Sequence, residues 1–175
     1  MRWRLLALAA VILLMLSVPA TLGAKTKPFK PKLVAGTWSG SWHNQTFNST
    51  GTITLQGKVV LRGMAFRFVV DLGGNALGCP DTPPERTPMI TKGRGKNHWN
   101  AKGFKLNLNS PAYGAFNVSY SQKTHKLTGS GGHPSCAPDV TWKLDGKLTK
   151  GAFTGTVTIA LPNQTATSTI NATRQ

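Results

Sequence analysis

Residues 92–105, rich in lysine, arginine and glycine, combine the side chains best suited to binding chemistry in this sequence. Cations can hold phosphate, sulfate or carboxylate groups, while an aromatic face can stack on a base or a sugar. The candidate ligand-binding residues here are Lys92, Arg94, Lys96, His98, Trp99 and Lys102. The alternative is a basic hairpin with solvated lysines and an inward-packed Trp99. No nucleic-acid-binding signature accompanies the stretch, so it indicates an anionic partner without specifying its class.

A second candidate ligand-binding site is the pair Trp38 and Trp42, in the glycine-spaced residues 36–42. Side chains alternate along a strand, so both indoles fall on one face, with only glycines between and before them. Such a face gives large rings space and lets backbone or ligand approach closely. The alternative is that both tryptophans simply fill a core.

Three of the five acidic residues lie close in sequence to the two cysteines: Asp81, Glu85 and Asp139. A bond between Cys79 and Cys136 would hold their Cα atoms about 6 Å apart and bring these loops together. Carboxylate oxygens suit hard cations, so these acids are candidate metal ligands. The alternative is that they pair with Arg86 or cap turns.

Enzymatic readings find little support in the sequence. The four histidines are scattered, and neither a G-x-S-x-G elbow nor a Walker loop is present. Five acids leave few options for a paired-carboxylate hydrolase. We therefore expect a protein without catalytic residues and without a cofactor.

The first 24 residues resemble an export signal. Arg2 and Arg4 precede an apolar run over 5–18, and Ala20 and Ala24 are suitable for cleavage. The run is shorter than the ~20 residues of a spanning helix, so we expect a secreted or cell-envelope protein with no membrane span after cleavage. In that compartment, Cys79 and Cys136 are expected to form a disulfide.

The mature chain is strongly basic. The formal net charge of +16 falls to +14 when the two leader arginines are removed. This excess favours polyanions or anionic surfaces as partners. Residues 25–32, with two prolines and four lysines, are expected to form an extended, solvated tether instead of a packed element.

From residue 33 onward, apolar and polar residues alternate with period two nearly throughout. Five such segments can be cited: Ile53 to Val59, Met64 to Leu72, Phe104 to Leu108, Val140 to Leu144 and Val157 to Leu161. Turn residues separate them, and no helical spacing is sustained. The sequence predicts one all-β domain over 33–175, an antiparallel meander of about 8–10 strands, folded as a single barrel or a two-sheet sandwich.

The opening Gly36-Thr37-Trp38, together with Arg174 in the last strand, resembles the pattern of calycin-type β-barrels, the lipocalins and avidins. In that group a G-x-W on the first strand packs beneath a basic residue from the closing strand. The resemblance covers about ten residues and one arginine. It implies a barrel; the later avidin tryptophans have no counterparts, so no biotin chemistry is implied.

Two functional hypotheses follow. The first is a secreted, non-enzymatic protein that binds an anionic envelope polymer or surface through residues 25–32 and 92–105. The second is a barrel that carries a small apolar ligand beside Trp38 and Trp42, and an enzyme is the remaining alternative. Five N-x-Ser/Thr triplets would be glycan sites in a eukaryotic source: Asn44, Asn48, Asn117, Asn163 and Asn171.

Overall fold

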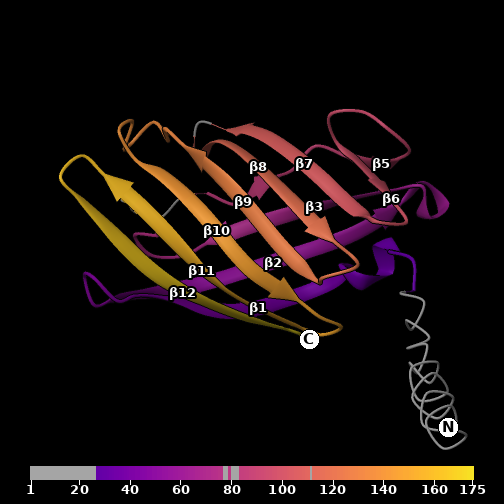
Figure 1. Ribbon diagram of the computed structural model, residues 1–175, viewed down its shortest axis with the longest axis horizontal. Coiled ribbons are helices and arrows are strands. Elements are labelled where there is room, and N and C mark those ends of the chain that lie inside the picture. Colours follow the sequence, from indigo (N-terminus) through magenta and orange to yellow (C-terminus); the bar gives the residue numbers. More distant parts are fainter. Residues whose placement is uncertain (1–26, 77–78, 80–82, 111) are drawn as a thin grey trace, which may run out of the picture.

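The computed structural model describes residues 27–76, 79, 83–110 and 112–175, and its chain is almost entirely β-structure (Figure 1). The expected signal peptide lies outside the described residues. In order, the elements are η1 (Pro31–Leu33), β1 (Gly36–Asn44), β2 (Ser49–Val60), η2 (Leu61–Gly63), β3 (Ala65–Leu72), β4 (Glu85–Arg86), β5 (Ile90–Lys92), β6 (His98–Asn100), β7 (Gly103–Ser110), β8 (Gly114–Ser121), β9 (Lys126–Gly132), β10 (Thr141–Leu148), β11 (Ala152–Leu161) and β12 (Gln164–Arg174). Within these ranges, no helix is long and apolar enough to cross a membrane.

The strands form one sheet that closes on itself as a barrel. Its order is β2-β1-β12-β11-β10-β9-β8-β7-β6-β5-β3-β4, and an additional pairing of β2 with β3 completes the ring. Strand β4 pairs only with β3, outside the ring. The all-β fold is confirmed, and of the two architectures left open by the sequence, the barrel is correct.

The long strands are those that the period-two alternation predicts, because each has one face inside the barrel. The structure adds the short strands β4, β5 and β6 in residues 85–100, where prolines and glycines interrupt the alternation. Among them, β5 and β6 pair in parallel, in contrast to the antiparallel pairing elsewhere in the ring. The predicted meander is therefore interrupted at this place.

One end of the barrel, here called the plugged end, is filled by the segment that precedes β1. Phe29 is 2% exposed, and its amide donates a hydrogen bond to the carbonyl of Ala101 at 2.9 Å. Its ring centroid lies 5.6 to 6.0 Å from four aromatic rings: Phe66, Trp99, Phe104 and Tyr120. The expectation that residues 25–32 are not packed is wrong at this point, because an aromatic side chain between the prolines gains more by burial than it loses in freedom.

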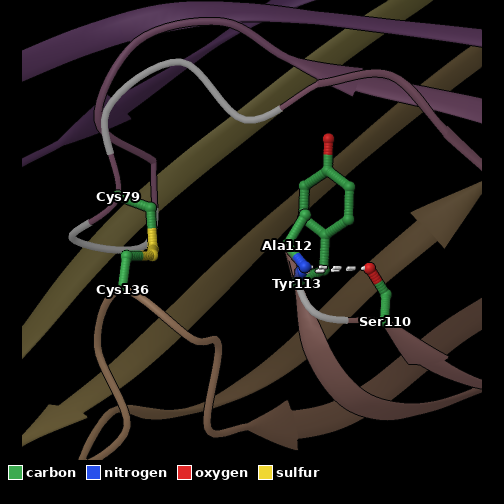
Figure 2. Close-up of a disulfide and its surroundings, with 5 residues drawn as sticks. All are labelled: Cys79, Ser110, Ala112, Tyr113 and Cys136. Atoms are coloured by element: carbon green, nitrogen blue, oxygen red, sulfur yellow. Dashed lines mark hydrogen bonds between the residues drawn. A yellow bond between two sulfur atoms is a disulfide. The ribbon is translucent and has the colours of Figure 1, made fainter.

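The opposite end, here called the disulfide end, carries the bond between Cys79 and Cys136 (Figure 2). The bond confirms the predicted pairing, and the two Cα atoms lie 5.7 Å apart. It ties the loop between β3 and β4 to the loop between β9 and β10. The same view includes the β7–β8 turn, where the Ser110 hydroxyl accepts a hydrogen bond from the amide of Ala112 at 3.1 Å.

Candidate ligand-binding cavity

The inward faces of the strands enclose a cavity of about 220 Å³. Its wall is almost entirely apolar, because the period-two alternation places aliphatic and aromatic side chains inside on every long strand. Several of these side chains keep a substantial exposed fraction although they point inward: Leu55, Phe68, Val118, Leu127 and Leu144. That exposure is to the cavity, so the barrel interior is not completely filled by its own side chains.

Two wall tryptophans are each accommodated by a glycine on the neighbouring strand. Trp42 pairs with Gly51, and a Cβ atom at Gly51 would lie 2.5 Å from the Trp42 indole. Trp142 pairs with Gly131, where a Cβ atom would lie 2.7 Å from the Trp142 ring. Each ring therefore takes space that a side chain at the paired glycine would occupy; these glycines lie on the neighbouring strands, whereas the sequence pointed to the glycines within residues 36–42.

The wall also contains a few polar groups. The Trp142 Nε1 and the Ser168 hydroxyl are buried and have no hydrogen-bond partner in the described part of the chain. Glu85 lines the cavity from β4, and its Oε2 accepts a hydrogen bond from the Ser110 hydroxyl at 2.8 Å. By contrast, Trp42 donates its indole N–H to the Gly73 carbonyl at 3.0 Å. The Trp142 Nε1 and the Ser168 hydroxyl are shielded from the cavity as well as from solvent, so the surface that a ligand would meet is almost entirely apolar.

Trp38 and Arg174, the two residues that carry the calycin resemblance, lie on the first and last strands of the barrel. They are direct partners in the β1–β12 ladder, and Trp38 lines the cavity. The Arg174 guanidinium donates to the Lys32 carbonyl at 3.2 Å, so this arginine also ties the plug segment to the closing strand.

Tyr120 packs against Phe29 at the plugged end and does not line the cavity. Its hydroxyl lies 3.0 Å from His125 Nδ1 and 3.3 Å from Gln122 Oε1. Burial raises the pKa of the Tyr120 phenol above its ordinary value of 10.0, because the charged form would lose its hydration.

The structure divides the predicted ligand-binding residues between two places. Trp38 and Trp42 line the cavity, whereas the six candidate residues between positions 92 and 102 lie outside it. Four of the latter are exposed cations: Lys92, Arg94, Lys96 and Lys102. His98 is half-buried, with Nδ1 hydrogen-bonded to the Gly95 carbonyl.

Trp99, the aromatic member of that stretch, is 8% exposed and packs into the plug. Its indole N–H donates to the Met64 carbonyl at 3.2 Å, and the Lys92 ammonium lies 5.8 Å from its ring centroid. The expectation that Trp99 offers a face for stacking is therefore wrong, and the alternative of an inward-packed Trp99 is correct. Burial of the large apolar indole ring is more favourable than its exposure to solvent at this position.

The proposed carboxylate cluster is only partly described. Asp81 lies outside the described residues, Glu85 faces the cavity, and Asp139 is exposed in the β9–β10 loop. Within the described part of the chain, no three His, Cys, Asp or Glu side chains gather closely enough to hold a metal ion. Of the asparagines in N-x-Ser/Thr triplets, Asn44 is buried, and its Oδ1 accepts hydrogen bonds from the amides of Thr46 and Phe47.

Several residues of the cavity were not singled out from the sequence. Trp142, Phe116 and Ser168 line the wall from strands β10, β8 and β12, and the Trp142 and Phe116 ring centroids lie 5.8 Å apart. The inward register of each alternating segment was available as a signal. Which inward positions border empty space depends on barrel closure, which a single strand does not encode.

Comparison with known proteins adds the fold alone. No family model matches the sequence, and no curated protein is detectably similar to it. A DUF3598-family protein of unknown function from Nostoc punctiforme aligns with 85% of this chain and 50% of its own length, at 7% identity and a TM-score of 0.53. Rv2717c from M. tuberculosis aligns over 82% of this chain and 93% of its own, at 10% identity and a TM-score of 0.54. The chain spans half the length of the Nostoc protein, and at these identities both likenesses concern only the barrel.

Proposed function

We propose that this protein is a non-enzymatic barrel that binds a small apolar ligand in its interior. The observation that carries the proposal is the cavity of about 220 Å³ with an apolar wall. An apolar cavity that is not filled by side chains forgoes van der Waals contacts, which a ligand of matching shape would restore. The resemblance to calycin-type barrels at Trp38 and Arg174 supports the same function.

The cavity volume sets the size of the ligand. An apolar cavity of about 150 Å³ holds benzene, so by proportion this one suits a molecule on the order of nine carbon atoms. At about 0.8 kcal/mol for each buried CH₂ group, such a ligand gains on the order of 7 kcal/mol, which corresponds to a dissociation constant of roughly 10 μM.

Binding of the neutral dye 1-aminonaphthalene tests the proposal, with fluorescence as the readout. Val118 is half-buried and lines the cavity, so Val118→Phe is expected to occupy part of the ligand space and weaken binding about tenfold. Asn117→Phe is the matched control, because the Asn117 side chain, next to Val118 in the same strand, is exposed on the outer face. Equal affinities of the two variants, or a steep loss of binding with salt, would contradict an apolar interior site.

A second function concerns the outer surface: attachment of an exported protein to an anionic polymer or surface of the envelope. The supporting observation is that the exposed cations of residues 92–105 are accompanied by almost no acid. In the described part of the chain, a single ion pair forms, between Lys126 and Asp145 at 3.3 Å. The exposed cations described in residues 92–105 therefore form no ion pair and can bind an external anion.

Retention on a heparin resin tests this second function. The triple variant Lys92→Gln/Arg94→Gln/Lys96→Gln is expected to elute at clearly lower salt than wild type, because the three exposed cations lie within five residues at the end of β5 and in the β5–β6 loop. The control is Lys143→Gln on β10, which lies toward the disulfide end. A shift per charge equal to that of the control would show that retention reflects net charge alone.

A further inference from the structure

The charges of the barrel are segregated along its axis. Most lysines and arginines of the described chain lie on the plugged end or on the part of the wall nearest to it; Arg86 and Lys143 lie toward the disulfide end. Three of the four described acids, Asp71, Glu85 and Asp139, lie toward the disulfide end, and the fourth, Asp145, is paired with Lys126 nearer the plugged end. The plugged end is therefore the surface that an anionic partner would meet first.

Two apolar side chains protrude from this basic end. Leu61 is 61% exposed and Met64 is 51% exposed, and both belong to the β2–β3 hairpin, at the right in Figure 1. The alternating pattern predicts Met64 inside the barrel, but β3 begins only at Ala65, and Met64 turns outward. We call Leu61, Arg62, Gly63 and Met64 the hairpin tip.

Cations surround the hairpin tip on its neighbouring strands. Arg62 lies within it, Lys58 lies on β2, and Arg67 lies on β3. The β5–β6 loop is held beside it, since the Lys92 amide donates to the Met64 carbonyl at 2.8 Å. Protruding apolar side chains with a basic rim suit the interface of an anionic bilayer, where apolar groups enter between headgroups and cations pair with phosphates.

The backbone of the hairpin tip is unfavourable in the free protein. Leu61 and Arg62 have φ values of 51° and 52°, in the left-handed region that disfavours side chains of their size. Leu61 thus combines a strained backbone with an apolar side chain in water. Strain held at an exposed apolar residue points to a role in binding.

We propose that the hairpin tip inserts into the headgroup region of a bilayer rich in anionic lipid, with the surrounding cations paired to lipid phosphates. This proposal deepens the second function above and rests on it, since it names the anionic partner. The segment before β1, which carries the exposed Lys27 and Lys30, lies at this same end and adds to its positive charge. The disulfide end would point away from the membrane.

Co-sedimentation with vesicles tests the proposal. Wild-type protein is expected to bind vesicles of equal parts phosphatidylcholine and phosphatidylglycerol, and to bind pure phosphatidylcholine only weakly. Leu61→Asn/Met64→Ser is expected to bind about tenfold more weakly, because two apolar side chains no longer enter the interface. Lys92→Gln/Arg94→Gln/Lys96→Gln is expected to bind about a hundredfold more weakly.

The matched control is Phe47→Ser. Phe47 is 50% exposed in the β1–β2 hairpin, which lies at the disulfide end, so its replacement should leave vesicle binding unchanged. Leu61→Asn alone provides an independent readout. Asparagine tolerates the left-handed region, so this variant should melt roughly 2–4 °C higher than wild type while binding vesicles less well.

The outcomes separate the two levels of the proposal. If the Leu61→Asn/Met64→Ser protein binds like wild type while the charge variant does not, the basic end holds a polyanion by charge alone and the insertion proposal is wrong. If both variants bind vesicles like wild type, the proposal of an anionic partner is wrong as well. Equal binding to both vesicle types would show that anionic lipid is not recognised.

Discussion

Replacing Phe29 by alanine tests whether the segment before β1 is part of the folded barrel. Phe29 is almost completely buried, with four aromatic rings around it at centroid distances of 5.6 to 6.0 Å. Truncation of a core phenylalanine costs about 3–5 kcal/mol. The segment can detach while the strands stay paired, which limits the loss to its docking free energy. We therefore expect the lower value, about 3 kcal/mol.

Urea unfolding of the mature protein measures the change in the free energy of unfolding directly. In thermal unfolding, for a chain of this length, a loss of about 3 kcal/mol lowers the melting temperature by roughly 6–12 °C. A second signal is available, because Trp99 borders Phe29 with ring centroids 6.0 Å apart. Detachment of the segment admits water to this indole, so its emission should shift to longer wavelength at native conditions.

The control is Lys30→Ala, in the same segment with an exposed side chain. We expect a change within about 0.5 kcal/mol for it. If Phe29→Ala and Lys30→Ala unfold at the same urea concentration, residues 27–34 do not stabilise the barrel. That result would contradict a packed segment at the plugged end and would favour the solvated tether expected from the sequence.

Three further predictions concern the wall, the disulfide and the plug. Gly51→Ala should lower the free energy of unfolding by about 1–3 kcal/mol in urea, because its Cβ would lie 2.5 Å from the Trp42 indole. A Cys79→Ser/Cys136→Ser protein should lose about 4 kcal/mol, the chain-entropy estimate for a bond spanning 57 residues, and a loss below about 1 kcal/mol would contradict it. Tyr120 has a raised pKa, so the folded state holds its proton longer than the unfolded state. The stability it confers is complete below pH 10.0 and decreases as the pH rises further, and this decrease should be absent from Tyr120→Phe in melting curves across that range.

The sequence predicts the strands well and the interior less well. Trp38, Trp42 and Ile53 are buried as their alternation requires, since side-chain direction in a strand is a local property. The position of Met64 is predicted wrongly, because a left-handed turn ends the alternation there. Phe29 is missed because a proline-rich flanking sequence carries no sign of the distant rings that cover it.

The candidate site shows the same division. Trp38 and Trp42 were identified from their spacing and do line the cavity, whereas Trp142 and Ser168 reach it from strands that the chain visits much later. Trp99 was grouped with nearby cations because they are neighbours in sequence. In the barrel its ring faces Phe29, whereas Lys92, Lys96 and Lys102 belong to β5 and to the adjoining loops and are exposed to solvent.

The most direct test of the account is ¹⁹F NMR of the mature protein labelled with 5-fluorotryptophan. Single Trp→Phe variants assign the signals, and the protein is then titrated with 1-aminonaphthalene. The signals of Trp42 and Trp142 should shift with ligand, because both rings line the cavity, while that of Trp99 should stay in place. A shift of the Trp99 signal alone, or no shift of any signal at saturating dye, would contradict an interior binding site.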